Sequence, residues 1–415
     1  MLQVTRWSVA CIVSAISALA GTTASAQCGG ICLYENGSPD LGRAAAGAGA
    51  RAQDASTALW NPAGMTELEG SEVQLGVIAS FGYLNPELDA STVSPDPPAR
   101  GGGNASGFTP LLGGFLSLKL PYDLRFGMGS TVLSGGVVDY DSNWTGRGYV
   151  VDASLLSFLL QPSLAVPVTD WLSLGAGPAI LYTMFSERVK AVNLPGEPTV
   201  KIDDADDWSV GGVFSALVKP IDGTRIGINY RTEIDANTQG TFEGPLGTNP
   251  SIDTDFTIPQ GINASVYQQL GEAWALLADA GWTDWSEFSN IPIQLGPLGA
   301  TQQRGWRDTW RAAIGFQYTP FEKWTLQSGF GYDSSPVKSS RLLPDIPTSQ
   351  QYRFSAGIQL RPRDYVEMGV SYQFLWFEGI EFDRVALPPS GNVVLDGDYD
   401  PSSAHFAGVS VRVKF

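Results

Sequence analysis

Histidine and cysteine are scarce in this chain of 415 residues, and their scarcity excludes several kinds of chemistry. His405 is the single histidine, and Cys11, Cys28 and Cys32 are the three cysteines. So few nitrogen and sulfur ligands do not make an ordinary zinc site, and we expect no metal and no cofactor. Hydrolysis by a histidine base beside a nucleophile is also disfavoured, because His405 falls on the outward face of its strand-like segment. The sequence does not predict an enzyme.

Long apolar runs are missing beyond the N-terminal leader. Residues 1–26 have the form of a signal peptide, with Arg6 in the basic region, an apolar run over 9–20, and small residues at 24–26 before the cleavage site. No later segment approaches the roughly 18 uninterrupted apolar residues of a membrane-spanning helix. We therefore expect an exported protein without a helical membrane span.

Basic residues are outnumbered by acidic ones, 25 against 42, which sets the net charge at -17. A strongly acidic chain repels nucleic acid, so nucleic acid is not expected as a partner. Cleavage of the leader removes Cys11 and leaves Cys28 and Cys32, spaced C-x3-C. In an oxidising compartment this pair is compatible with a short-loop disulfide or with two free thiols.

Glycine is abundant, with 48 residues, and so are segments in which apolar residues alternate with small or polar ones. Alternation is typical of a strand whose two faces meet different environments. It predicts strands at 71–83, 110–120, 124–135, 148–166, 171–186, 208–219, 224–235, 254–267, 272–285, 305–319, 323–333, 351–361, 364–378 and 402–415. Long connections such as 84–109, 187–207 and 379–401 alternate with short ones. The pattern predicts an all-β fold, a 14-stranded antiparallel transmembrane β-barrel over residues 71–415.

A water-soluble β-sandwich also alternates, but the aromatic residues favour the barrel. Tryptophan and tyrosine gather near strand ends on the apolar faces, as interfacial girdles require: Trp171, Tyr182, Trp282, Trp306, Trp324, Tyr372 and Trp376. The chain also ends, at Phe415, in an alternating segment with an apolar outward face. Because lipid demands closed backbone pairing, the barrel is the preferred fold.

Residues 27–70 precede the first strand and are rich in alanine and glycine. Pro62 has no N–H and disfavours helix at Asn61, so the "NPAG" step ends the short helix that "DASTALW" can form. Because small residues pack compactly, residues 27–70 are predicted to fill the lumen of a wide barrel as a plug. A flexible periplasmic leader is the alternative that composition leaves open.

Three stretches carry a resemblance to a known family. The segment "GRAAAGAGARAQDASTALWNPAGM" resembles the N-terminal hatch of the FadL/TodX family of outer-membrane transporters for hydrophobic compounds. The segments "WRDTWRAAIGFQYTPFEKWTLQSGFGYDSSPV" and "LPDIPTSQQYRFSAGIQLRP" resemble its C-terminal strands. The resemblance implies a hatch with the element Asn61, Pro62 and Ala63, a hydrophobic capture site among extracellular loops, a second pocket in the lumen, and sideways release through a kinked third strand.

The third and fourth predicted strands hold the candidates for these last features. Gly127 and Gly129 permit a kink in the third strand, or equally leave room for the hatch. Leu155 and Leu159 make the fourth strand apolar on both faces. They indicate either a ligand-binding patch in the lumen or a contact with the hatch.

Inward-facing arginines are candidates for binding a carboxylate head group: Arg225, Arg231, Arg307, Arg311 and Arg353, with Arg311 and Arg353 retained as ligand-binding candidates. The alternative is that they pair with luminal acids such as Glu233 or Glu367, or hold the hatch. The acidic loops "KIDDADDW" and "LDGDYD" lack the spacing of a calcium loop and are interpreted as solvated surface.

The sequence thus predicts a passive, monomeric transporter of the Gram-negative outer membrane, set among outer-membrane lipid and lipopolysaccharide. Its expected substrates are long-chain fatty acids, with aromatic hydrocarbons as the alternative. A general diffusion porin is the rival from another class, although an open pore has no need of a plug. The residues do not choose between the substrates, because pocket shape depends on loops that vary freely.

Overall fold

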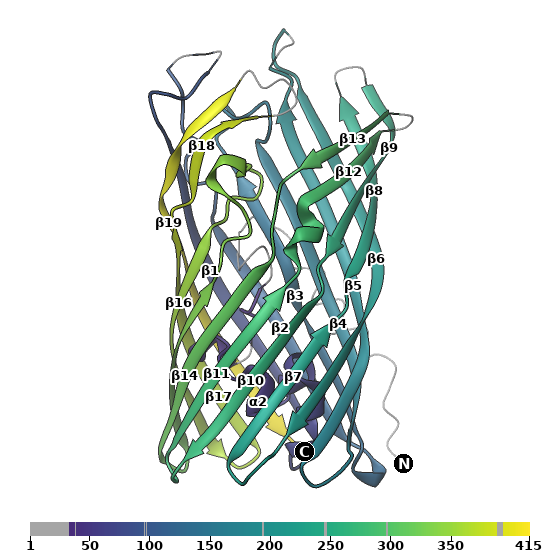
Figure 1. The fold of residues 1–415 in the computed structure, drawn as a ribbon, viewed down its shortest axis with the longest axis vertical. Helices are drawn as coiled ribbons and strands as arrows, with labels where there is room; N and C mark the ends of the chain where they lie inside the picture. Colours follow the sequence, from purple (N-terminus) through teal and green to yellow (C-terminus); the bar gives the residue numbers. More distant parts are fainter. Residues whose placement is uncertain are drawn as a thin grey trace.

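The wall of the molecule is one closed antiparallel sheet. The computed structural model describes residues 33–415 apart from 38, 95, 97, 193–194, 245–246, 296–297 and 388–392. Fourteen strands pair in a ring that returns from the last to the first (Figure 1). In ring order they are β1 (Glu72–Leu88), β2 (Phe108–Lys119), β3 (Arg125–Asp139), β4 (Asp152–Pro167), β5 (Leu172–Lys190), β6 (Thr199–Val218), β7 (Thr224–Arg231), β10 (Gly261–Leu270), β11 (Trp274–Thr283), β14 (Thr309–Phe321), β15 (Trp324–Asp333), β16 (Gln350–Arg363), β17 (Val366–Glu378) and β19 (Val394–Lys414). The predicted 14-stranded antiparallel barrel is confirmed, while the predicted signal peptide at 1–26 and the pair Cys28 and Cys32 lie outside the described residues.

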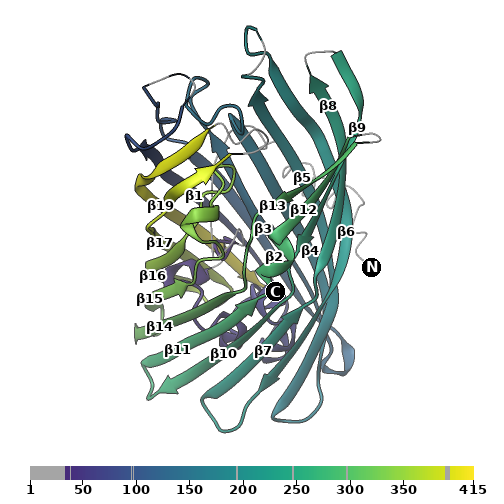
Figure 2. The ribbon, with the colours of Figure 1, turned by 45° about the horizontal axis from the view of Figure 1, so that its top comes forward.

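Five further strands extend the wall at the end with the long connections: β8 (Ile234–Gly244), β9 (Gly247–Ile258), β12 (Asn290–Leu295), β13 (Leu298–Gln303) and β18 (Glu381–Ala386). Here β8 pairs with the far part of β6, β9 joins β8 to β12, and β18 pairs with β19 (Figure 2). Two sequence expectations are therefore wrong. Residues 254–267 span β9 and β10 instead of forming one strand, and much of 187–207 is strand, since β5 and β6 pair as far as Lys190 and Thr199.

The two errors have different causes. Residues 251–258 of β9 alternate as a lipid-facing strand does, with Ile252, Phe256 and Ile258 buried and Asp255 exposed, so the pattern did not separate β9 from β10. The far end of β6 is a run of acidic residues, Asp203, Asp204, Asp206 and Asp207, which reads as a loop. Its strand conformation comes from pairing with β5 and β8.

Within the lipid-facing part, the side chains alternate as predicted. On β14, the side chains of Trp310, Ile314 and Phe316 are exposed, whereas Arg311 and Gln317 on the other face are buried. Trp306 is an exception, because β14 begins only at Thr309 and Trp306 is 6% exposed in an apolar cluster. A break in the strand before Thr309 removes the parity on which its outward placement rested.

The two ends of the barrel differ. Short connections lie at the end that holds the C-terminus, where the Phe415 N–H donates to the Ser71 carbonyl over 2.8 Å (Figure 1). One of them contains the short 3-10 helix η3 (Pro121–Asp123), and the longer connections at the other end contain η4 (Trp285–Ser289) and η5 (Ser339–Arg341). No helix in the described part of the chain is long and apolar enough to cross a membrane.

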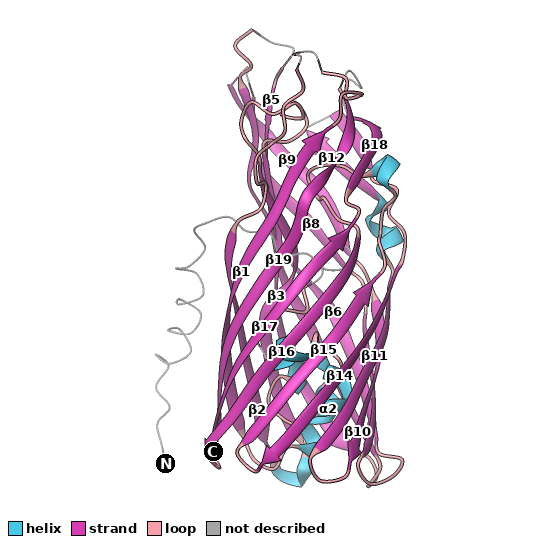
Figure 3. Ribbon diagram, turned by 90° about the vertical axis from the view of Figure 1, so that its left-hand side faces the viewer, coloured by secondary structure: helices cyan, strands magenta, loops and turns pink. Residues whose placement is uncertain are grey.

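Residues 33–70, here called the N-terminal segment, lie inside the barrel toward the C-terminal end (Figures 1 and 3). They form η1 (Pro39–Arg43), α2 (Ala48–Arg51), α3 (Thr57–Trp60) and η2 (Pro62–Glu67), and most of their side chains are buried. Helix α3 ends where the Asn-Pro step predicts, because Asn61 is extended (φ -161, ψ 91) and Pro62 begins η2.

Candidate ligand cavity in the barrel lumen

The N-terminal segment is bonded to the wall around the Asn-Pro-Ala element. The side-chain amide of Asn61 (Nδ2) donates to the Gly49 carbonyl over 2.6 Å and to the Ala216 carbonyl of β6 over 3.0 Å. The Ala63 N–H donates to Ser215 Oγ over 3.0 Å. Asn61 therefore ties α2, η2 and the wall together, and Pro62, without an N–H, needs no partner of its own.

Buried ion pairs hold the segment from within. Asp40 pairs with Arg43 and Arg51, and Arg51 pairs with Asp54. Burial opposes the ionisation of Asp54, but Arg51, Arg412 and the Ser56 hydroxyl lower the pKa of Asp54 to about 2. A buried pair that loses one partner leaves an uncompensated charge, so this cluster favours one arrangement of the segment.

Glycines on the inner face of the wall make room for this segment. A Cβ added at Gly76 of β1 or at Gly113 of β2 would overlap the backbone carbonyls of Gly37 or Asn36. On the far side of the barrel, a Cβ at Gly227 of β7 would overlap the carbonyl of Gly49. Only a residue without Cβ lets the two backbones approach so closely.

Gly127 and Gly129 belong to the same group. A Cβ at Gly127 would lie 2.9 Å from the Ala58 Cβ, and one at Gly129 would lie 3.0 Å from the Leu59 Cβ. Both glycines are paired on both sides, with β2 and with β4. Of the two interpretations, a kink in the third strand at these residues is therefore wrong, whereas room for the N-terminal segment fits, since both glycines provide space for α3 and η2.

The irregularity of β3 lies farther along the strand. Pairing between β2 and β3 ends at Gly113 and Thr131, after which residues 132–139 of β3 pair only with β4 among the described residues. The register with β4 shifts between Val132 and Ser134, and Gly135 has a φ of +155. The sequence signal was the Ser-Gly-Gly run at 134–136, which is better suited to a bulge than an isolated glycine.

The N-terminal segment contacts the part of β3 that does not pair with β2, here called the gap, through its first described residue. The Leu33 N–H donates to the Leu133 carbonyl over 2.7 Å. Beyond it, the Asp139 N–H donates to the Ala105 carbonyl over 3.0 Å and closes the far end. An unpaired backbone carbonyl is costly in an apolar setting, so Leu33 stabilises a gap that β2 leaves open.

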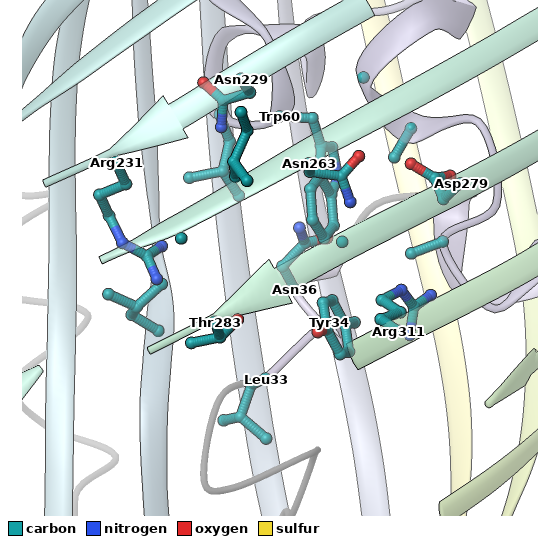
Figure 4. Close-up of a pocket in the computed structure, with 18 of the residues that line it drawn as sticks. Leu33, Tyr34, Asn36, Trp60, Asn229, Arg231, Asn263, Asp279, Thr283 and Arg311 are labelled. Carbon is teal, nitrogen blue, oxygen red and sulfur yellow. The ribbon is translucent and has the colours of Figure 1, made fainter. Parts of the chain in front are cut away.

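A cavity lies in the lumen beside the N-terminal segment (Figure 4). The space between its lining residues measures about 1020 Å³, open solvent included. One part of the lining is apolar, with Leu59, Leu133, Leu159 and Val213. The opposite part is polar and contributed by β7, β10, β11 and β14: Asn229, Arg231, Asn263, Asp279, Thr283 and Arg311. The cavity is therefore amphipathic along its length.

Of the two candidate leucines, only one lines this cavity. Leu159 is 2% exposed and packs in a cluster with Leu59, Leu133 and Val213. Leu155 belongs instead to a larger apolar cluster toward the long connections. Their shared inward face was visible in the sequence, but the height of each residue along the barrel was not.

The two candidate arginines are already engaged. Arg311 and Arg353 both pair with Asp333 of β15, and Arg353 also pairs with Glu35 over 3.1 Å. The Arg311 guanidinium lies 3.9 Å from the ring centre of Tyr34 and donates to the Ala44 carbonyl. They bind the N-terminal segment, Arg311 through Tyr34 and Ala44 and Arg353 through Glu35. Their acidic partner in the wall is Asp333 and not Glu233 or Glu367, and strand periodicity alone did not single it out.

The other arginines differ from one another. Arg307 is exposed and donates to the Ser335 carbonyl over 3.1 Å, so its predicted inward placement is wrong. The cause is the same break in the strand before Thr309 that makes the predicted outward placement of Trp306 wrong. The Arg225 guanidinium lies 4.2 Å from the ring centre of Tyr267. Arg231 lines the cavity opposite Arg311 (Figure 4).

Toward the long connections, apolar side chains gather in a large cluster. Trp285, Phe288 and Trp306 pack within it, with ring centres 4.8 Å apart for Phe288 and Trp306 and 5.2 Å for the two tryptophans. Arg304 and Asp345 form a buried ion pair at its edge. The cluster places a water-poor region above the lumen cavity.

The remaining candidates fall outside these sites. His405 lies on the outer side of β19, with its Nδ1 2.7 Å from the Tyr372 hydroxyl. Within the described ranges, no group of three or more His, Cys, Asp or Glu side chains is arranged to hold a metal ion.

A family model places the chain among known proteins. The model described as outer membrane protein transport protein (OMPP1/FadL/TodX) matches residues 19–415. The chain belongs to this family. It is thus an outer-membrane β-barrel of the OMPP1/FadL/TodX transport proteins, as the three resembling stretches implied.

Relatives in this family share sequence along nearly the whole chain. The long-chain fatty acid transport protein of Escherichia coli O6:H1 is 24% identical over 92% of this chain and 94% of its own length. Outer membrane protein P1 of Haemophilus influenzae is 24% identical over 85% of this chain and 87% of its own.

Solved structures show the same fold. A Pseudomonas aeruginosa FadL homologue has a TM-score of 0.83 at 24% identity and covers 93% of this chain and 99% of its own. The toluene transporter TodX of P. putida has a TM-score of 0.66 at 17% identity and covers 87% of this chain and 94% of its own.

Proposed function

We propose that this OMPP1/FadL/TodX protein takes up hydrophobic molecules passively, with long-chain fatty acids as the first substrate class. The observation that carries the proposal is the amphipathic lumen cavity beside the gap between β2 and β3. An apolar molecule that crosses the polar outer surface of the cell needs a sheltered path, and such a cavity offers one. The relatives named as long-chain fatty acid transport proteins support this choice.

In this proposal, each region has one step. The apolar cluster around Trp285 and Trp306 captures the substrate, the cavity binds it, and the gap between β2 and β3 at Leu133 releases it sideways into the membrane. Residues 27–70 act as a hatch domain, with the Asn61, Pro62 and Ala63 element as its anchor, and residues 71–415 form the barrel. We expect a monomer that contacts outer-membrane lipid and lipopolysaccharide, with no catalytic step.

Aromatic hydrocarbons are the second candidate, supported by the fold that the chain shares with the toluene transporter TodX. A general diffusion porin is disfavoured, because the buried N-terminal segment occupies the lumen. A porin would admit small hydrophilic solutes, whereas the proposed transporter would admit few of them.

The deciding experiment closes the gap with a disulfide crosslink between β2 and β3. Leu112 and Val132 would be the next pair in register after Gly113 and Thr131 if the β2–β3 ladder continued. In a background without Cys28 and Cys32, the pair Leu112→Cys and Val132→Cys should reduce fatty-acid uptake by cells when oxidised and restore it after reduction. A matched pair, Leu116→Cys and Met128→Cys, lies in the intact part of the same ladder and should not change uptake.

Two outcomes contradict the proposal in different ways. Equal uptake by the crosslinked and reduced gap variants would rule out sideways release and leave passage into the periplasm. No fatty-acid uptake above that of cells without the protein, together with free passage of small hydrophilic solutes, would support the porin instead.

A further inference from the structure

A belt of aromatic side chains marks the lipid boundary on one side of the barrel, near the long connections. Successive strands of the ring, β11, β14, β15, β16 and β17, contribute its members at nearly the same level: Trp282, Trp310, Tyr332, Tyr352 and Trp376. The ring centre of Tyr352 lies 5.4 Å from those of Tyr332 and Trp376, and Trp310 and Trp376 are exposed. Because such belts form where hydrocarbon meets polar head groups, the head-group layer begins at this level.

Three basic side chains lie just beyond the belt, and we call them the basic patch: Arg307, Lys338 and Arg341. All three are exposed. Arg307 precedes Trp310 by three residues, which is at most about 10 Å along a tilted strand. Lys338 caps the short helix η5, and Arg341 ends it. Since head groups occupy roughly 5–8 Å beyond the hydrocarbon of each leaflet, the basic patch begins within reach of that layer.

Backbone and side-chain contacts hold the basic patch together. The Arg307 Nε donates to the Ser335 carbonyl over 3.1 Å. The Arg341 N–H donates to the Lys338 carbonyl over 2.8 Å. The Arg341 side chain also lies on Gly305, so closely that its Nη1 would be 2.6 Å from a Cβ added there. The connection before β16 therefore lies against the residues before β14, and the three cations share one surface.

This surface faces away from the lumen. Trp306 and Leu342, the sequence neighbours of Arg307 and Arg341, are buried in the apolar cluster inside the barrel. The exposed cations therefore point to the other side. Figure 3 shows η4 and η5 at the right-hand edge of the barrel, above β11 and β14. The basic patch is thus part of the outer wall, above its lipid-facing strands.

The basic patch has no counter-charge of its own. Among the described residues, none of its three side chains forms an ion pair, whereas other cations at the same end do. Arg188 pairs with Asp152, and the Lys201 Nζ lies 3.5 Å from the Asp203 carboxylate. Like charges at close range favour an anion between them, and guanidinium groups bind phosphate oxygens through paired hydrogen bonds.

The acids that are close to the basic patch in the chain are engaged elsewhere. Asp308 accepts hydrogen bonds from the Trp282 indole N–H over 3.1 Å and from the Ser286 N–H over 3.3 Å. Asp345 is buried and pairs with Arg304. Neither carboxylate therefore neutralises the exposed cations.

We propose that Arg307, Lys338 and Arg341 bind the phosphorylated head group of a lipopolysaccharide molecule, whose acyl chains lie along the lipid-facing wall below the aromatic belt. Lipopolysaccharide fits because it carries several phosphates close to its acyl chains, so that more than one cation can bind at once. The inference goes beyond transport and does not depend on the substrate, and it gives a site to the lipid contact expected above. A lipid that binds only the folded barrel also stabilises it.

Binding to the purified full-length protein in detergent tests the basic patch. The probes are a short-core lipopolysaccharide, the same glycolipid after removal of its phosphates, and phosphatidylglycerol. Each cation at an anionic lipid surface is worth about a fivefold gain in affinity, so Arg307→Gln with Arg341→Gln should weaken binding of the phosphorylated glycolipid roughly 10- to 30-fold. Binding of the dephosphorylated glycolipid should not change. Arg307→Lys with Arg341→Lys keeps both charges and should retain most of the affinity.

Arg188→Gln with Lys201→Gln is the matched control, because it removes two positive charges at the same end from cations that pair with acids. It should keep the wild-type affinity. An equal loss in both double variants, no preference of the wild-type protein for the phosphorylated glycolipid, or equally tight binding of phosphatidylglycerol would each overturn the assignment. Failure of fatty-acid uptake would contradict the proposed transport and leave this binding result standing.

Hydrogen exchange locates the bound lipid. The phosphorylated glycolipid should slow amide exchange in residues 338–342, where the N–H groups of Arg341 and Leu342 close η5, and should leave residues 188–201 unchanged. The double glutamine variant should lose this protection. Binding at full affinity without protection of residues 338–342 would overturn the proposed location.

Discussion

Substitution of Gly113 by alanine should detach the start of the N-terminal segment from the wall. A Cβ at Gly113 would lie 2.8 Å from the Asn36 carbonyl carbon and would overlap its oxygen, whereas ordinary contacts begin at 3.4 Å. The Asn36 backbone cannot yield alone, because the Leu33 N–H three residues earlier is bonded to Leu133 over 2.7 Å. The new methyl therefore has to push residues 33–37 away from β2.

The cost can be estimated from the two interactions that change. Overpacking costs about 1–3 kcal/mol, and leaving the Leu133 carbonyl without its donor costs about 1–3 kcal/mol. Movement of the segment relieves the overlap but breaks the hydrogen bond to Leu133, so the two costs do not add in full. We expect a net penalty of about 2–4 kcal/mol on the docked state. This lowers the docked population of residues 33–37, relative to the detached one, by roughly 30- to 1000-fold.

Amide hydrogen exchange followed by mass spectrometry measures this directly. Exchange in residues 33–37 should accelerate by up to that factor in Gly113→Ala, while exchange in the strands of the barrel stays slow. Gly114→Ala is the matched control, because the added Cβ would lie 3.4 Å from the Leu75 side chain, an ordinary contact. Equal exchange of residues 33–37 in the two variants, with the barrel intact, would refute the reasoning.

Two further predictions concern buried charge. Asp333→Asn removes the shared partner of Arg311 and Arg353 and should destabilise the folded state by about 3–5 kcal/mol in thermal unfolding, whereas exposed Asp364→Asn should have little effect; equal loss in both would contradict the role of Asp333. Asp54 has a folded pKa of about 2 against an ordinary value of 3.8, so its contribution to stability is present above pH 3.8 and is lost as the pH falls through about 2. Asp54→Asn should therefore flatten the dependence of the unfolding free energy on pH in that window. An unchanged slope would show that the pKa of Asp54 is not lowered in the folded state.

The lipid-facing part of the barrel could be predicted from the sequence because lipid acts on every strand in the same way. Each strand needs an apolar outer face and a small or polar inner face, so segments such as 71–83 and 351–361 carry their own evidence. The Asn-Pro step at Asn61 is equally local, since proline restricts the residue before it. Alternation alone did not assign the additional strands, because β9 alternates as a lipid-facing strand does while its apolar residues Phe256 and Ile258 are buried in inner clusters.

The candidate site depended on contacts between residues far apart in the chain. Sequence parity placed Arg231, Arg311 and Arg353 alike on inner faces, but it did not show that Asp333 and Glu35 engage Arg311 and Arg353, whereas Arg231 forms no ion pair within the described residues. Likewise, glycine content suggested where β3 bends, but closure of the barrel around the N-terminal segment decided it. Gly127 and Gly129 meet the segment, and the unpaired stretch begins at the bulge beyond Thr131. Local periodicity determines which face a side chain occupies, whereas its partner and its height in the lumen are determined only when all fourteen strands close into one ring.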